Sequence, residues 1–229
     1  MDGATLVTTV CTDFLNVGGT DYLNAARRLR VLRAGQRAVD QLWGRTNWPF
    51  KRTSSTVAIT SGAYEGDLPA NYLAFGQHGG VFLPNNEGHV DWAPAGEIER
   101  LIQQTPQTGN PRVYHVIGQN TSGVKQLRVW PAPDANMSLT ITYDKRSPTL
   151  TDAAAPSGLE EIPAQWHYPV VYEWVCLLLM RKQGDSRSGS EQLGLVERAV
   201  AEMMKAERPA QEAALYLPSY GDGYGSMDG

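Results

Sequence analysis

The sequence predicts an α+β fold: a four-helix bundle built from both chain ends, an inserted small antiparallel β sandwich or barrel module, and an extended C-terminal tail. Three observations predict it. Residues 20–50 place apolar side chains at alternating spacings of three and four, as in a long amphipathic helix. Residues 53–162 hold short alternating runs broken by Gly, Pro and Asn, which is typical of strands and turns. Helical spacing returns after residue 163.

The composition is that of a globular protein with a sizeable core. The chain has 229 residues, of which 41% are hydrophobic and 19% charged. No run approaches the roughly 20 apolar residues of a membrane span, and the first residues lack the features of a signal peptide. We therefore expect a cytosolic protein with no membrane partner. Cys11 and Cys176 lie in apolar helical patterns and are predicted to be buried free thiols, since two cysteines make no disulfide framework.

Two helices open the chain. Apolar residues between Leu6 and Leu15 recur at helical spacing, and Gly18-Gly19 predict a tight turn into the long helix. Thr20 is the predicted N-cap of that helix and Pro49 its predicted end. The predicted apolar seam of the long helix consists of Tyr22, Ala25, Leu29, Leu32, Gln36, Val39 and Trp43, widened by Leu23, Ala26, Val31, Ala38 and Leu42.

The β module follows. Six segments have the alternation or composition of strands, at residues 55–62, 72–75, 81–83, 113–117, 127–129 and 139–143, and residues 97–104 predict a short helix among them. Residues 147–163 lack periodicity and are interpreted as a linker. Two further helices, with seams from Trp166 to Leu178 and from Leu193 to Met203, are predicted to bury their seams against the first pair. The predicted organisation is therefore a bundle from residues 1–52 and 163–208, a β module with linker at 53–162, and a tail at 209–229.

The tail is rich in glycine and tyrosine. Such a composition is typical of a disordered terminus. Tyr216, Tyr220 and Tyr224 nevertheless recur every four residues, and tyrosine rings bury much area for little lost rotamer freedom. We therefore expect another subunit to hold this tail.

Charge is unevenly distributed. Residues 20–52 hold eight Lys/Arg against two Asp, whereas residues 53–163 hold six bases against eleven acids. This division suits copies or neighbours that meet basic surface to acidic surface. A row of arginines, Arg27, Arg30, Arg33 and Arg37, lies along the long helix. It is either a solvated face or a stripe that faces an acidic partner surface or passing DNA.

No pattern of catalytic residues is convincing. The sequence has no P-loop, dinucleotide-binding or nucleophile-elbow motif, and we expect no cofactor and no metal. His78, His89 and Asp91 could form a metal triad, but their spacing matches no tight ligand motif. We expect a packed, hydrogen-bonded His115 and a solvated Glu160-Glu161 pair. The aromatic cluster Trp43, Trp48, Pro49 and Phe50 is predicted to fix how the β module leaves the bundle.

The order of segments resembles that of the head-to-tail connector, or adaptor, proteins of tailed bacteriophages. The phrases that carry the resemblance are NWPF, DLPANY, RVWPAPD and EEIP, within a likeness that runs from about residue 20 to 208. The resemblance implies a structural, non-enzymatic protein in a homo-oligomeric ring, commonly dodecameric, beneath the portal protein. The helices would form the wall of a DNA channel, with the β module facing outward or toward the tail.

The same resemblance implies the protein's partners and location. It places the protein in the head-tail neck of the virion, after assembly in the host cytoplasm. The portal protein, tail or nozzle proteins and, non-specifically, channel DNA would be its partners. The C-terminal segment would reach the portal, and the residues we expect to dock there are Leu215, Tyr216, Leu217, Tyr220 and Tyr224.

Two functions of other classes stay open. One is a hydrolase or carbohydrate-active domain on the β module, which a metal bound at His78, His89 and Asp91 or turnover lost in His89→Ala would favour. The other is a non-specific nucleic-acid-binding protein that uses the arginine row. Steep salt dependence of DNA affinity in the monomer would favour it.

Overall fold

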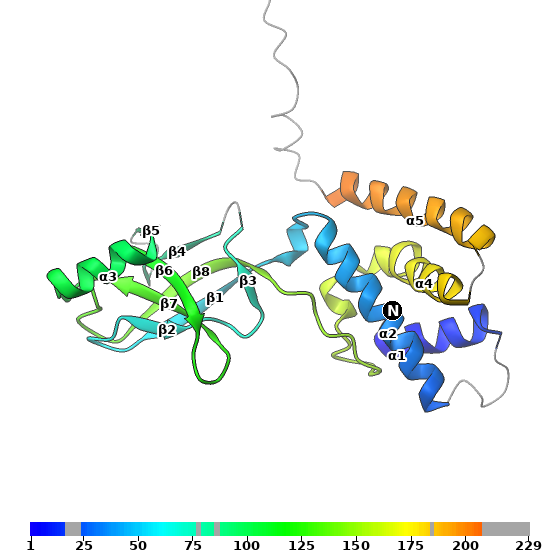
Figure 1. Cartoon of the computed structure of the whole chain (residues 1–229), viewed down its shortest axis with the longest axis horizontal. Helices are drawn as coiled ribbons and strands as arrows, with labels where there is room; N and C mark the ends of the chain where they lie inside the picture. The colour runs from blue at the N-terminus through cyan, green and yellow to red at the C-terminus, as the bar shows by residue number, and fades with distance from the viewer. Residues whose placement is uncertain (17–23, 77–78, 85–87, 184–185, 208–229) are drawn as a thin grey trace, which may run out of the picture.

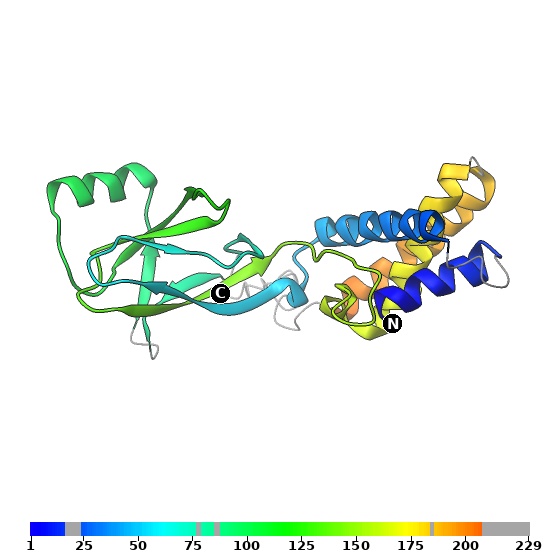
Figure 2. The ribbon, with the colours of Figure 1, turned by 90° about the horizontal axis from the view of Figure 1, so that it is seen from below.

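A computed structural model describes residues 1–16, 24–76, 79–84, 88–183 and 186–207. The described chain forms two halves, one of strands and one of helices, joined by a narrow waist through which the chain passes twice (Figures 1 and 2). Each half has its own hydrophobic core. The predicted turn at Gly18-Gly19, the predicted cap Thr20, and the tail lie outside the described residues.

The α+β class is confirmed, but the predicted architecture, a four-helix bundle with a small inserted β module, is wrong. The described residues form five α-helices and an eight-stranded, nearly closed sheet that makes up a full half of the molecule. The helices are α1 (Gly3–Thr9), α2 (Ala25–Arg45), α3 (Ala95–Gln104), α4 (Glu173–Gln183) and α5 (Ser186–Glu207).

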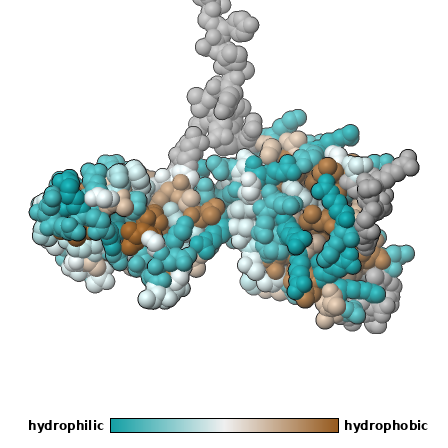
Figure 3. All heavy atoms as spheres, in the orientation of Figure 1, coloured by the Kyte–Doolittle hydropathy of each residue, from teal (hydrophilic) through white to brown (hydrophobic). Residues whose placement is uncertain are grey.

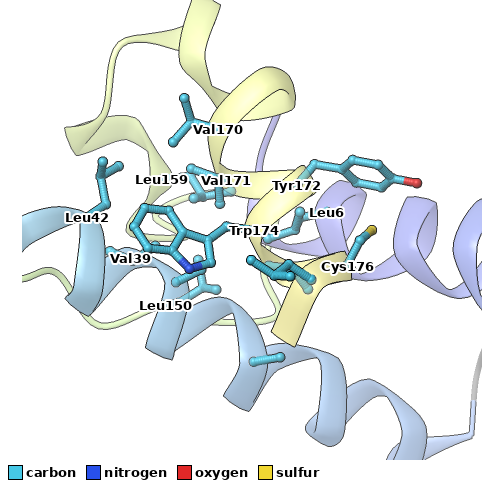
Figure 4. Close-up of a cluster of buried hydrophobic side chains, with 14 of the residues drawn as sticks. Leu6, Val39, Leu42, Leu150, Leu159, Val170, Val171, Tyr172, Trp174 and Cys176 are labelled. Carbon is cyan, nitrogen blue, oxygen red and sulfur yellow. The ribbon is translucent and has the colours of Figure 1, made fainter. Parts of the chain in front are cut away.

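The core of the helical half is not enclosed by regular helices alone. Two of its segments, Val10–Phe14 and His167–Tyr172, are π-helical, and the segment predicted as a linker contributes the buried Leu150, Leu159 and Ile162. Figure 4 shows Leu150 and Leu159 in one cluster with Leu6 of α1, Val39 and Leu42 of α2, and Trp174 next to them. Periodicity reveals neither a π-helical insertion nor an irregular segment with three scattered apolar residues, so the sequence indicated a simpler bundle than the one that forms.

Helix α2 is shorter than predicted and is turned about its axis relative to the predicted seam. Asn24 caps it, since its Oδ1 accepts from the backbone N–H groups of Ala26 and Arg27. It ends at Arg45, four residues before Pro49. Leu29, which we placed on the seam, is 46% exposed. The buried residues are Val31, Ala34, Gly35, Ala38, Val39, Leu42 and Trp43.

The sheet of the β half has the strand order β1-β8-β4-β5-β6-β7-β2, with the short β3 also paired to β8. Its core is made by alternate residues of the long strands, such as Leu139, Ile141 and Tyr143, because successive side chains point to opposite faces. The strands are β1 (Arg52–Ile59), β2 (Glu65–Asp67), β3 (Tyr72–Ala74), β4 (Gly80–Phe82), β5 (His89–Trp92), β6 (Val113–Gln119), β7 (Lys125–Trp130) and β8 (Met137–Lys145).

The sheet is mixed, which corrects the prediction of an antiparallel module. Strands β5 and β6 pair in parallel, and α3 makes the crossover between them, while the other described strand pairs are antiparallel. Parallel neighbours need such a crossover, whereas antiparallel ones need only a short turn. The sequence did not reveal β5, because only Val90 of its four residues is buried.

The two edge strands, β1 and β2, close the barrel by direct approach. A Cβ added to Gly66 of β2 would lie 2.7 Å from Val57 Cγ1 and 2.8 Å from the carbonyl oxygen of Ala58. Only a glycine lets the two backbones come this close. Gly66 therefore sets the closure of the sheet.

Candidate assembly surfaces

The residues considered for chemistry do not form a catalytic or metal centre in the described part of the chain. His89 Nδ1 lies 3.2 Å from Asp91 Oδ1 in an exposed pair, and His78, the third member of the considered triad, is outside the described residues. No group of three His, Cys, Asp or Glu residues suited to a metal ion occurs among the described residues.

The other candidate acids and bases have structural partners. His115 is hydrogen-bonded as predicted, with Nδ1 3.0 Å from the carbonyl oxygen of Ala93. Glu160 accepts from the N–H and Oγ of Ser157, and these hydrogen bonds lower the pKa of its carboxyl group. Glu161 pairs with Lys145, across the waist. The Glu160-Glu161 pair is thus divided between two structural roles.

The predicted arginine row is present on α2. All four members, Arg27, Arg30, Arg33 and Arg37, are exposed. Within the described chain no carboxylate pairs with Arg30, Arg33 or Arg37. Three guanidinium groups on about two turns of one helix therefore keep their full charge for a partner.

Ion pairs near both ends of α2 hold this row in place. Arg28 donates to both carboxylate oxygens of Asp152 at 2.7 and 2.6 Å, and Arg45 donates to both oxygens of Glu197 on α5 at 3.0 and 2.6 Å. Two-point contacts of this kind fix orientation as well as distance. The basic row thus stands on a helix that is clamped to the loop 147–163 at one end and to α5 at the other.

The waist is built on the aromatic cluster that the sequence singled out. Trp48 stacks on Phe50 with ring centroids 5.6 Å apart, and Trp43 meets the same ring edge-on at 5.5 Å. Trp43 Nε1 donates to the carbonyl oxygen of Lys145, at the point where the chain returns from β8. The cluster therefore ties both chain passages together, in agreement with the role predicted for it.

Two shallow hollows adjoin at the end of α2, and sequence reasoning missed them. One, of about 460 Å³, lies between α2, α4 and α5, and the other, of about 680 Å³, extends to the waist; Gly44 and Arg45 line both. The signal in the sequence that could have revealed them was Gly44, between Trp43 and Arg45 in a helix. Glycine inside a helix is destabilising, so it is expected where another group must approach the helix backbone closely.

Large apolar side chains are also exposed elsewhere on the described surface. Trp92 is 60% exposed, and Leu195 and Tyr168 are each more than half exposed. Figure 3 shows hydrophobic patches on both halves of one face, among hydrophilic residues. Exposed aromatic and aliphatic groups of this size favour a protein that contacts other proteins.

The family model described as "SU10 adaptor protein" matches residues 1–217. The chain belongs to the SU10 adaptor protein family. The match includes Leu215, Tyr216 and Leu217 of the tail but ends before Tyr220 and Tyr224. No curated protein sequence matches the chain.

Membership of the SU10 adaptor family makes the chain a bacteriophage structural adaptor, associated with the virion. The resemblance seen in the sequence is thereby confirmed at the level of a phage adaptor. Within the described ranges, no helix has both the length and the apolar character needed to cross a membrane.

Proposed function

We propose that this protein is a subunit of a ring that joins the DNA-filled head of a tailed phage to its tail. The ring lies below the portal protein, in the neck of the virion, and surrounds the channel through which DNA leaves. Its role is structural and involves no catalytic step. The observation that carries the proposal is the row of arginines on α2 in a phage adaptor, in which Arg30, Arg33 and Arg37 are exposed and have no carboxylate partner in the described chain.

The arginine row supports the ring because it offers a basic surface for contact with the neighbouring subunit. A closed ring needs a heterologous contact, in which one face of a subunit meets a different face of the next. The described half that carries α2 offers basic surface, while residues 53–163 carry an excess of acids. The row of one copy thus faces acidic surface of its neighbour, and non-specific contact with channel DNA is the second candidate for the same cations.

Sizing of the assembled protein tests the ring. The full chain, mixed with its portal protein, should form a closed homo-oligomer whose copy number electron microscopy counts, and we expect twelvefold symmetry from the resemblance. An open filament, or a protein that stays monomeric on the portal, would contradict the proposal. In the proposed ring, tail or nozzle proteins bind the side that faces away from the portal.

Deletion of the tail tests the portal contact. The tail residues proposed to dock, Leu215, Tyr216, Leu217, Tyr220 and Tyr224, lie outside the described residues. Neither hydrophobic core of the described chain uses a residue beyond Met204, so removal of residues 209–229 should leave the folded halves intact. We expect the shortened protein to keep its circular dichroism spectrum and to lose portal binding. Portal binding that survives the deletion would refute the docking role.

A further inference from the structure

The two hollows at the end of α2 share Gly44 and Arg45 and form one groove with apolar and basic lining residues. Leu193 in the first hollow and Leu73 in the second supply its accessible apolar surface, because the other apolar lining residues, Trp43, Trp174 and Leu177, are buried. Leu73 is 44% exposed, so this surface is open to a ligand. The exposed cations that line the groove are Arg45, Arg146 and Arg181, against one acid, Asp40, while the lining residue Lys51 is buried and donates its Nζ to the carbonyl oxygen of Thr46.

Existing contacts leave part of that positive charge available. Arg45 is neutralised by Glu197 and also lies 5.2 Å from the ring centroid of Trp174. Asp40 already accepts from Gln36 and Ser147. Arg146 and Arg181 are exposed, and within the described chain neither pairs with a carboxylate. The groove therefore fits an extended segment that carries apolar or aromatic side chains and negative charge.

The chain's own C-terminal residues have this chemistry. Residues 212–220 contain one acid, Glu212, and no Lys or Arg, and two further acids, Asp222 and Asp228, follow them. Leu215, Tyr216 and Leu217 form an apolar run within residues 212–220. The segment thus matches the groove in the sign of its charge and in the character of its side chains.

The distances allow the segment to reach the groove of its own chain. Glu197, which pairs with Arg45 at the groove, lies ten residues before the end of α5 at Glu207. Those ten residues span about 15 Å of helix. Residues 208–217, when extended, span about 33 Å. Short tethers of this kind give effective concentrations of about millimolar.

We propose that residues 212–220 of the C-terminal segment lie in the groove of their own chain, across Gly44, before the subunit joins a partner. The groove is a docking site for an acidic, aromatic peptide segment, and Gly44 leaves the space through which its backbone crosses α2. The contact goes beyond the portal role proposed above and does not depend on it. If both hold, groove and portal compete for one segment.

Disulfide trapping in the full chain tests the proposal. A Cβ at Gly44 meets nothing within 4 Å, so Gly44→Cys is tolerated, and Ser219→Cys is a conservative change in the segment. The matched control pairs Ser219→Cys with Ala201→Cys, an exposed position on α5 that is nearer to the end of the helix. The natural Cys11 and Cys176 are buried in both proteins.

We expect the Gly44 pair to form an intramolecular disulfide at least about tenfold faster than the Ala201 pair, because docking raises the local concentration of the thiol. An unattached segment would react with Ala201→Cys as fast or faster, and that result would overturn the proposal. Disulfide-linked dimers would overturn it as well, since they place the segment on a second copy.

A second variant ties the trapping to the proposed contacts. Adding Tyr216→Ser and Leu217→Ser to the Gly44 pair removes the apolar anchors outside the described cores, so folding should be unaffected. The disulfide rate should then fall to that of the control pair. An unchanged rate would show that the segment does not use the groove. Neither measurement involves portal binding. The disulfide rates therefore test the groove contact even if the segment does not bind the portal.

Discussion

At the scale of single residues, the buried polar side chains that the structure describes are hydrogen-bonded. No buried side-chain nitrogen or oxygen in the described chain lacks a hydrogen-bond partner. Lys51, only 6% exposed, donates its Nζ to the carbonyl oxygen of Thr46 and lies over the Trp43 ring, and burial lowers its pKa. His167 is buried with Nε2 2.7 Å from the carbonyl oxygen of Ile162. Such satisfied groups are structural, which fits a structural adaptor.

The two cysteines should be unreactive in the folded protein. Burial raises the pKa of Cys176 to about 12 and also raises that of Cys11, and a thiol reacts as its thiolate. At pH 8 we expect a thiol reagent such as dithionitrobenzoate to modify neither in the native chain and both after addition of denaturant. Rapid labelling of the native protein would contradict this packing.

Stability should fall in alkaline solution. Burial raises the pKa of Tyr72 to about 12, as it does for Cys176, so the folded state holds these protons more tightly than the unfolded state. Their stabilisation is complete below the unfolded values of 10.0 and 9.0 and is lost as pH rises toward about 12. Lys51, whose pKa is lowered, acts in the opposite direction but is one group.

Urea unfolding followed at a series of pH values from 8 to 11 measures this effect. The Tyr72→Phe variant, which removes one such proton, should show a shallower loss of stability with pH. A wild-type midpoint that stays constant or rises over this range would contradict the assignment.

At the scale of elements, the cap of α2 offers a test of how the basic row is held. Asn24→Ala removes the acceptor for two backbone N–H groups and should destabilise the helical half by about 1 kcal/mol. Asn24→Asp keeps the acceptor and adds a negative charge at a helix N-terminus, so it should be neutral or stabilising. Urea unfolding measures both. Equal losses in the two variants would show that the cap contributes nothing.

Closure of the sheet is the second element-scale prediction. Gly66→Ala would place a methyl group 2.8 Å from the backbone oxygen of Ala58, which cannot move without shifting β1. We expect a loss of about 1–3 kcal/mol. The control, Gly118→Ala, puts the same methyl group on β6, where nothing lies within 4 Å, and should be tolerated. Thermal unfolding followed by circular dichroism compares them, and equal midpoints would contradict the close approach.

How far the sequence predicted these elements depended on the length of each pattern. The 21-residue α2 and the nine-residue β8 were evident, because a long run repeats its period several times. The three-residue β2 and four-residue β5 contain one buried residue each and gave no repeat to detect. The burial of Leu150 and Leu159 depends on partners distant in the sequence, which no local pattern encodes. Among the surfaces, the arginine row was visible for the same reason as its helix, whereas the groove, assembled from several separate segments, was not.

At the scale of the whole molecule, basic and acidic residues are unevenly distributed along the chain. The helical half carries the exposed arginine row, and the chain between residues 53 and 163 carries eleven acids against six bases. The waist joins the halves through Trp43, whose indole donates to the carbonyl oxygen of Lys145. Repeated copies can meet basic surface to acidic surface around a closed ring.

The arginine row should control assembly without controlling folding. In the triple variant Arg30→Gln, Arg33→Gln and Arg37→Gln, each change affects an exposed side chain with no carboxylate partner in the described chain, so the free energy of unfolding should change by less than about 0.5 kcal/mol per site. The concentration needed for assembly should rise at least about tenfold and should become less sensitive to salt, because fewer charges are screened. Light scattering over a salt series measures both effects.

The matched control removes two exposed cations from α5 instead, with Arg198→Gln and Lys205→Gln. It should assemble like the wild type, because the proposed contact depends on where the charge lies and not on net charge. A control that assembles as poorly as the triple variant would show that only net charge matters. If the triple variant assembles normally but its DNA affinity falls and loses salt dependence, the row faces the channel, and its place at the subunit contact is wrong.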